Sequence, residues 1–327
     1  MPTKKAKKTT KHVILITGSS GQIGTNLAIK LLKKGYKVIG VDKRQNSWTK
    51  SIPTIISNLS VTPKKHGKGI GSDNFPKCDL VVHLAANAKV HALVKEPRKA
   101  LENINVTFNV LEYSRHNNIP IIFASSREVY GDIHRYITNE RQANFSFTES
   151  PYSASKIAGE ALVYSYARCY GTKYLVFRFS NVYGRYDNDL SRMERVIPLF
   201  INKLSNNEDI TVFGKNKILD FTYVDDCVQG VYLGIKNLLS SKVENRTINL
   251  AYGKGEKLVD VAKIIAKETK SKSKINIEPQ KLPGEVTHYV ADISIAKKLL
   301  MYHPKTNINK GIKNAIEWSE TYASKIN

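Results

Sequence analysis

The chain has 327 residues, which is long enough for one large α/β domain and a smaller lobe, each with an apolar core. Lysine and arginine number 51 against 28 acidic residues, so the formal net charge is +23. No stretch approaches the length of a transmembrane helix, and the three cysteines lack the paired spacing of disulfide or metal sites. We therefore expect a soluble cytoplasmic protein without a metal, whose positive charge suits ligands that carry phosphate. No nucleic-acid-binding motif is visible, so we expect no nucleic-acid partner.

Residues 1–11 form a separate basic segment. They carry five lysines and show no apolar periodicity, which predicts a disordered arm. The apolar run that follows is too short for the hydrophobic region of a signal peptide, and it leads directly into a glycine-rich loop.

That loop lies between a strand and a helix. Residues 12–17 are apolar and β-branched, as in a buried parallel strand, and residues 25–34 have helical periodicity. Glycines in this position allow the backbone to approach a pyrophosphate, whose charge the helix N-terminus stabilises. The loop therefore predicts a dinucleotide site. Its predicted cofactor contacts are Gly18, Ser20, Gly21, Gln22, Ile23 and Gly24.

Asp42 follows the second predicted strand, residues 36–41. A carboxylate there accepts hydrogen bonds from ribose hydroxyls and repels a 2′-phosphate, so NAD is favoured over NADP. The adjacent Lys43 and Arg44 weaken this inference, because basic side chains can bind that phosphate. Residues 80–84 predict a third buried strand, and small residues after it would let the cofactor lie close to the backbone. Further predicted cofactor contacts are Leu84, Ala85, Ala86, Asn58 and Leu59, the last two in a predicted surface loop over residues 52–77.

Strand and helix patterns alternate along the first half of the chain. Strands are expected at 119–124 and 174–179, and helices at 98–116 and after Pro151. This alternation predicts an α/β fold, a doubly wound parallel sheet of the Rossmann type with a smaller C-terminal lobe that binds substrate. We assign residues 12–184 to the cofactor-binding domain, and residues 185–327 mainly to the lobe, with some segments returning to the sheet.

Tyr152 and Lys156 are the strongest catalytic candidates. Four residues apart, they lie one turn apart on the same face of a helix. A lysine ammonium near a phenol favours the phenolate, so we expect the tyrosine pKa to fall toward neutrality. Such a group can accept the proton of a sugar or alcohol hydroxyl during hydride transfer to a nicotinamide.

Seven segments in order resemble the extended short-chain dehydrogenase/reductase family, in particular the NAD-dependent nucleotide-sugar epimerases and dehydratases of the UDP-glucose 4-epimerase type. They are residues 17–24, 83–86, 105–106, 125–131, 152–156, 178–184 and 220–226. The resemblance implies that Tyr152 is the base and Lys156 its electrostatic partner and ribose contact. Ser126 would bond the reacting hydroxyl, Asn105 would lie behind the site, and Asn181 would face the substrate diphosphate.

Two departures from the family pattern bear on the substrate. Dehydratases of the family carry an Asp-Glu pair where this chain has Arg127 and Glu128, so dehydration is not expected. Glu128 is a catalytic candidate, because the nucleotide-sugar decarboxylases keep a glutamate there, although it could instead orient substrate or backbone. Arg127 could pair with a uronate carboxylate. Leu219 stands where an arginine commonly meets the diphosphate, so the substitute cation would be Lys217, Lys281 or Arg185.

The sequence thus predicts an isomerase, an NAD-dependent 4-epimerase of a UDP-hexose that forms a transient 4-keto sugar. The family's dimer helices correspond to residues 98–116 and 152–170, so a homodimer is expected. One alternative is a nucleotide-sugar decarboxylase or another enzyme that forms a 4-keto sugar. Another is a non-catalytic protein that senses NAD and binds a macromolecule, against which the presence of Tyr152, Lys156 and Ser126 argues.

Overall fold

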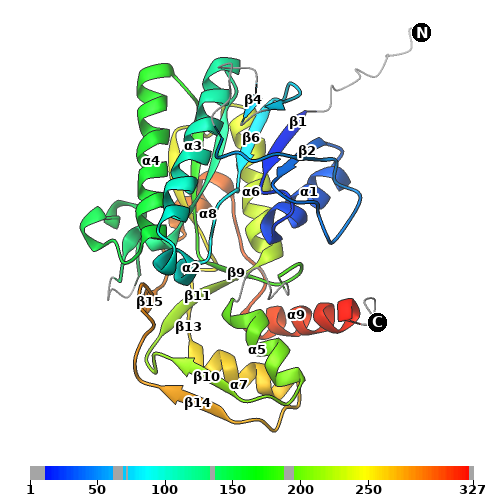
Figure 1. Cartoon of the computed structure of the whole chain (residues 1–327), viewed down its shortest axis with the longest axis vertical. Helices are drawn as coiled ribbons and strands as arrows, with labels where there is room; N and C mark the ends of the chain where they lie inside the picture. Colours follow the sequence, from blue (N-terminus) through cyan, green and yellow to red (C-terminus); the bar gives the residue numbers. More distant parts are fainter. Residues whose placement is uncertain (1–11, 62–68, 71–72, 133–136, 188–194, 324–327) are drawn as a thin grey trace.

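The computed structural model describes residues 12–61, 69–70, 73–132, 137–187 and 195–323; the predicted basic arm lies outside them (Figure 1). At its centre is a sheet of seven parallel strands. In spatial order these are β12 (Arg246–Leu250), β8 (Tyr174–Phe179), β7 (Ile121–Ser126), β6 (Leu80–His83), β1 (Val13–Thr17), β2 (Lys37–Asp42) and β3 (Thr54–Ile56). The prediction of a doubly wound parallel sheet is confirmed.

Helices cover both faces of this sheet, which is why its strands read as continuous apolar runs (Figure 1). Ile14 and Ile16 of β1 pack into the core on one face, and Leu15 between them packs into the core on the other. On the first face lie α1 (Gln22–Lys33), α6 (Val224–Leu239) and α8 (Ser294–Leu300), and on the second α3 (Arg98–Asn117) and α4 (Pro151–Tyr170).

The strand order reverses at β1, which pairs with β2 on one side and with β6 on the other. In open parallel sheets a crevice forms at such a point, outside the carboxyl ends of the strands, and ligands bind there. The short helix α2 (Val90–Lys95) follows β6 at this edge, and the 3₁₀ turn η1 (Arg127–Tyr130) follows β7.

The smaller lobe lies beyond this edge of the sheet (Figure 1). It contains a parallel pair of strands, packed helices and a second small sheet. Its elements are α5 (Val196–Ser205), α7 (Leu258–Glu268), α9 (Ile308–Ala323), β9 (Asn181–Tyr183), β10 (Ile210–Phe213), β11 (Ile218–Tyr223), β13 (Gly255–Lys257), β14 (Ile275–Glu278) and β15 (His288–Tyr289). β12 and α6 come from the same half of the chain but belong to the central sheet and its helical layer. The domain boundary at residue 184 stays a prediction.

The expected surface loop over residues 52–77 is partly wrong. Residues 54–56 form β3, the edge strand, which pairs with β2 from Gly40 to Asp42. Three residues are too few to show strand alternation, and the pairing with β2 supplies the backbone hydrogen bonds that define the strand. Two further short strands, β4 (Gly69–Ile70) and β5 (Asp73–Asn74), pair with each other, and residues 62–68 and 71–72 lie outside the described residues.

Two further short 3₁₀ turns lie between η1 and α4. They are η2 (Glu140–Gln142) and η3 (Phe145–Phe147), and residues 133–136 before them lie outside the described part of the chain. No helix in the described ranges is both long enough and apolar enough to span a bilayer.

Candidate active site

A cavity of about 540 Å³ lies at the carboxyl ends of β1, β6, β7 and β8 and extends into the smaller lobe. This volume is typical of pockets that hold small molecules and cofactors. Thirteen of the predicted site residues line it: Gly18, Gln22, Ile23, Gly24, Leu84, Ala86, Ser126, Arg127, Glu128, Tyr152, Lys156, Asn181 and Lys217. Those that do not are Ser20, Gly21, Asp42, Asn58, Leu59, Ala85, Arg185 and Lys281.

The glycine loop forms a cradle that has no room for larger side chains. Gly18 has a left-handed φ of +74°, and a Cβ added there would lie 2.8 Å from the backbone nitrogen of Ala85. A Cβ on Gly24 would overlap the Gly18 carbonyl oxygen. These close approaches allow α1 to begin directly beneath the cavity with its N-terminus toward it, as a pyrophosphate requires. The loop geometry therefore fits a dinucleotide.

Asp42 ends β2 beside this loop and is 8% exposed. Its carboxylate accepts hydrogen bonds from the backbone nitrogens of Ser20, at 3.0 Å, and Arg44, at 3.2 Å. These bonds fix the carboxylate next to the cradle, and its role as ribose acceptor stays a prediction. Asn58 is exposed and its side chain bonds Ser60, whereas Leu59 is buried. The contact of these two residues with the cofactor also stays a prediction.

Tyr152 lies on the first turn of α4. Ser150 caps this helix by accepting from the Ser153 backbone nitrogen, and Pro151 takes the first helical position, where its missing N–H costs nothing. Burial raises the pKa of Tyr152 to about 12, and a hydrogen bond with Ser126 only partly opposes this. The expectation of a pKa near neutrality is therefore wrong for the chain by itself.

Lys156 lies one turn further along the same face. Its Nζ donates to the Ala124 carbonyl at 2.7 Å and lies 5.1 Å from the centre of the Phe123 ring and 5.8 Å from that of Tyr152. Burial lowers the pKa of Lys156 to about 8, while the charge of Glu160 raises it. The predicted Tyr152–Lys156 proximity is thus present, but desolvation dominates the titration of both groups.

Ser126 ends β7, and its hydroxyl oxygen accepts from the Glu128 backbone nitrogen at 3.2 Å. This bond caps η1 and turns the chain so that Arg127 and Glu128 both reach the cavity wall. Arg127 Nη2 and Glu128 Oε1 form a buried ion pair at 2.9 Å, and burial raises the pKa of Glu128. Within the described residues, Arg127 Nη1 and Glu128 Oε2 have no hydrogen-bond partner.

The three cations proposed to replace an arginine at position 219 have different surroundings. Lys217 is buried on the cavity wall, where its Nζ lies 2.7 Å from Glu285, and Leu219 lies close by on the same wall. Arg185 pairs with Asp225, and Lys281 Nζ pairs with Asp132 at 2.8 Å. Neither Arg185 nor Lys281 lines the cavity. Lys217 is therefore the one of the three whose side chain reaches the cavity.

Asn105 does not lie behind the site as expected. It is exposed, whereas Asn103 is buried two residues earlier. Asn103 Nδ2 donates to Ser155 Oγ of α4 at 3.1 Å and to the Asn87 carbonyl at 3.0 Å. The signal was present in the sequence, because the buried positions 103, 107, 110, 111 and 114 recur at helical spacing.

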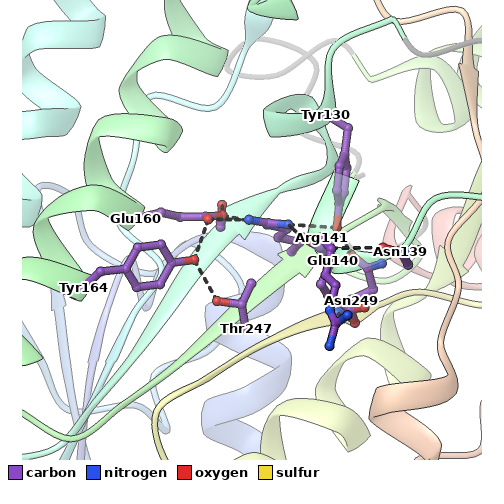
Figure 2. Close-up of polar contacts among 10 residues, drawn as sticks. Tyr130, Asn139, Glu140, Arg141, Glu160, Tyr164, Thr247 and Asn249 are labelled. Atoms are coloured by element: carbon purple, nitrogen blue, oxygen red, sulfur yellow. Dashed lines mark hydrogen bonds and ion pairs between the residues drawn. The ribbon is translucent and has the colours of Figure 1, made fainter. Parts of the chain in front are cut away.

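A buried ion pair that was not predicted from the sequence lies further along the same face of α4. Glu160 accepts from Arg178 Nη2 at 2.6 Å and Nε at 2.9 Å, and from the Ser125 hydroxyl at 2.5 Å. Figure 2 shows Glu160 beside Tyr164, whose hydroxyl also donates to it, at 2.8 Å. The spacing of residues 152, 156, 160 and 164 would have indicated this face.

Arg178 extends this network to Tyr130 and Glu140, both of which are labelled in Figure 2. Its Nη1 donates to the Tyr130 hydroxyl at 3.1 Å and to the Glu140 carbonyl at 2.7 Å. Tyr130 in turn donates to Asn249 Oδ1 at 2.6 Å.

In the described part of the chain, the His, Cys, Asp and Glu side chains form no group of three that could hold a metal ion.

Comparison with known proteins agrees with this geometry. The model of the NAD dependent epimerase/dehydratase family matches residues 14–251. The chain is 31% identical to "Putative UDP-glucose 4-epimerase" of Methanocaldococcus jannaschii, over 94% of this chain and 98% of that protein. It is 28% identical to UDP-N-acetyl-alpha-D-glucosaminuronate decarboxylase of Bacillus cytotoxicus, over 94% and 98%.

A solved structure of UDP-glucose 4-epimerase with UDP-glucose, from Thermotoga maritima, superposes with a TM-score of 0.85 at 28% identity. The match covers 95% of this chain and 99% of that one. The family model alone covers well over half of the chain. This protein is therefore a member of the NAD dependent epimerase/dehydratase family.

Proposed function

We propose that the protein is an NAD-dependent nucleotide-sugar 4-epimerase that acts on a UDP-hexose. The observation that carries this proposal is one cavity that joins the glycine cradle, the group Ser126, Tyr152 and Lys156, and the smaller lobe. A nicotinamide, a sugar and a nucleotide would need to lie end to end in such a space. The likeness to the UDP-glucose 4-epimerase structure supports this assignment.

The residues of the glycine cradle and Asp42 would hold NAD, which supplies the acceptor for a hydride from C4 of the sugar and returns it. Tyr152 takes the proton of the C4 hydroxyl as the 4-keto sugar forms and gives it back after the sugar has turned. Ser126 donates a hydrogen bond to the same oxygen, and the Lys156 ammonium favours the phenolate of Tyr152. Because burial holds the pKa of Tyr152 near 12, this positive charge must offset a substantial desolvation cost.

The substrate diphosphate would lie at the lobe end of the cavity. Lys217 and Asn181 are the polar candidates there, since both line the cavity. Asn181 Nδ2 donates to the Asp220 carbonyl at 3.0 Å, and Lys217 pairs with Glu285. To bind Lys217, a diphosphate would have to displace Glu285 from it.

Proton NMR of the purified protein with UDP-glucose, UDP-galactose and UDP-glucuronate, each with a trace of NAD⁺, tests the proposal. Interconversion of C4 epimers without net NADH is the expected result, and it identifies the sugar. No change in any of the three spectra, with NAD⁺ bound, would contradict a UDP-hexose 4-epimerase.

A decarboxylase is the second candidate, and Glu128 is the observation that favours it. Its carboxylate is buried on the cavity wall beside Ser126, and one of the similar proteins is named as a decarboxylase of a uronate. The same NMR experiment separates the two functions, because decarboxylation of UDP-glucuronate gives a pentose. The role of Arg127 can be tested with the same substrate. Equal turnover of the uronate by wild type and Arg127→Ala would exclude a pairing of Arg127 with the uronate carboxylate.

The outer face of α3 and α4 supports a homodimer. Leu101, Phe108 and Tyr170 on these helices are exposed apolar or aromatic side chains. Burying them against a second copy removes apolar surface from water.

A cytoplasmic location also stays a prediction, which fractionation of cells tests.

A further inference from the structure

Four polar side chains follow one face of α4 at intervals of four residues: Tyr152, Lys156, Glu160 and Tyr164. Residues at this spacing are neighbours on a helix surface. Tyr152 and Lys156 reach the cavity, whereas Glu160 lies behind it and is 5% exposed. The catalytic face of the helix thus continues into a buried carboxylate that the proposed reaction does not use.

The position of Glu160 is fixed from two strands. Arg178 of β8 binds both of its oxygens, and Ser125 of β7 donates to Oε1 at 2.5 Å. Such two-point arginine–carboxylate contacts specify geometry as well as contributing energy. Because Ser125 directly precedes Ser126, the same carboxylate ties the catalytic helix to the strand that carries the catalytic serine.

Lys156 is a buried cation with few compensating charges. Its Nζ bonds a backbone carbonyl and lies over the Phe123 ring, and both contacts are with uncharged groups. Glu160 is the charge that raises the pKa of Lys156 against burial. The titratable and charged groups on the elements around Lys156 are Tyr152 and Glu160 of α4, His83 of β6, Arg127 and Glu128 of η1, and Arg178 of β8.

We propose that Glu160 is a positioning residue of the reaction, which sets the register of α4 against β7 through Ser125 and places a fixed negative charge one turn from Lys156. This inference rests on the proposed function, because it assigns Glu160 a part in the same chemistry. Arg178 donates to both carboxylate oxygens of Glu160, so the position of this charge relative to Lys156 is fixed.

Glu160→Gln tests the inference, because it keeps the shape and removes the charge. Without that charge the pKa of Lys156 moves further below about 8, so Lys156 loses its proton at a lower pH. We expect the alkaline limb of kcat to move down by about one pH unit, and kcat above it to fall roughly tenfold. KM for the sugar should change less than about twofold, since Glu160 does not line the cavity.

Removing Glu160 alone leaves Arg178 buried without its partner, which can unfold the protein. The double variant Glu160→Gln, Arg178→Gln avoids this and should shift the alkaline limb in the same direction by a smaller amount, because a neighbouring positive charge is removed as well. Glu112→Gln is the matched control: its carboxylate bonds Arg115 and the Tyr166 hydroxyl between α3 and α4, away from the cavity. If Glu160 had only a structural role, Glu160→Gln and Glu112→Gln would both lower the stability of the protein, and neither would move the alkaline limb of kcat.

NMR of the Lys156 Cε resonance in lysine-labelled protein, assigned with Lys156→Arg, measures the charge effect without turnover. A lower Lys156 pKa in the Glu160 variants, with an unchanged pKa in Glu112→Gln, supports the inference. An unchanged Lys156 pKa together with an unmoved alkaline limb would overturn it. A shifted pKa in a protein that turns over no nucleotide sugar would instead count against the proposed function.

Discussion

The proposed role of Tyr152 as a base conflicts with its burial. A base must lose its proton, yet burial raises the pKa of this phenol to about 12. The surrounding groups that oppose burial are Ser126, Arg127 and Arg195, while the charge of Glu128 adds to it. The sequence identifies Tyr152 from its spacing to Lys156, but the degree of burial depends on the whole fold and cannot be predicted from that spacing.

Tyr152→Phe keeps the ring and removes the hydroxyl that, in the proposed reaction, accepts and returns the proton. We expect kcat to fall by about 10²- to 10⁴-fold with little change in KM, the usual loss for a general acid–base group. Steady-state kinetics of the wild type and the variant measures this. Tyr166→Phe is the control, because that hydroxyl lies on the same helix but bonds Glu112. A kcat for Tyr152→Phe within tenfold of wild type would contradict its role as base.

His83 gives a prediction about stability. It is 2% exposed, lies between the hydroxyls of Thr17 and Thr107, and burial lowers its pKa to about 3. The native state therefore holds His83 neutral, whereas the unfolded chain binds a proton below about pH 6.5. Its contribution to stability is present above pH 6.5 and is lost as the pH falls toward 3.

Burial raises the pKa values of Asp187 and Asp220 to about 7, so these two groups make the protein more stable as the pH falls. Comparison with a variant that lacks only the histidine separates the effect of His83 from theirs. We compare the free energy of unfolding of wild type with that of His83→Gln. The difference between the two should fall by about 2 kcal/mol from pH 7 to pH 5, because pH 5 lies about 1.5 units below the pKa of the histidine in the unfolded chain. Urea unfolding at the two pH values measures it. A difference that stays constant would show that His83 is not held neutral.

Among the elements, the glycine loop has a backbone that leaves little room for substitution. Gly18→Ala introduces a side chain at positive φ, against the backbone nitrogen of Ala85. We expect the affinity for NAD⁺ to fall at least about tenfold, because 1.4 kcal/mol of strain or displacement is enough for that. Titration calorimetry measures it, and Gly35→Ala, at positive φ but in open space, is the control. Equal NAD⁺ affinity in wild type and Gly18→Ala would contradict the cradle.

The long elements were predictable because burial on both faces leaves continuous apolar runs such as that of β1. β3 was missed because an edge strand of three residues has no periodicity of its own. Asn105 was predicted from the family resemblance, whereas the helical spacing of positions 103, 107, 110 and 114 indicates that Asn103 lies on the buried face of α3. Lys217 could not be separated from Arg185 and Lys281 because their partners, Glu285, Asp225 and Asp132, come from other segments.

For the whole molecule, the proposed homodimer can be tested at the outer face of α3. Leu101 and Phe108 are exposed and seven residues apart, so they lie on one side of the helix. Phe108→Glu places a charge in the proposed interface, and we expect light scattering to give the mass of one 36.8 kDa chain in place of two. Ile295→Glu on α8, also exposed, should remain a dimer. A wild-type protein that is monomeric at micromolar concentration would contradict the interface.

In the proposed reaction C4 of the sugar is transiently oxidised, and the same hydride returns to it inside one cavity. UDP-glucose deuterated at C4 tests this reaction, with NMR and mass spectrometry of the product. We predict a C4 epimer that retains its deuterium, with no label in released NADH and none lost to solvent. Loss of the C4 label, or a product that keeps its configuration and loses carbon dioxide or water, would contradict this reaction.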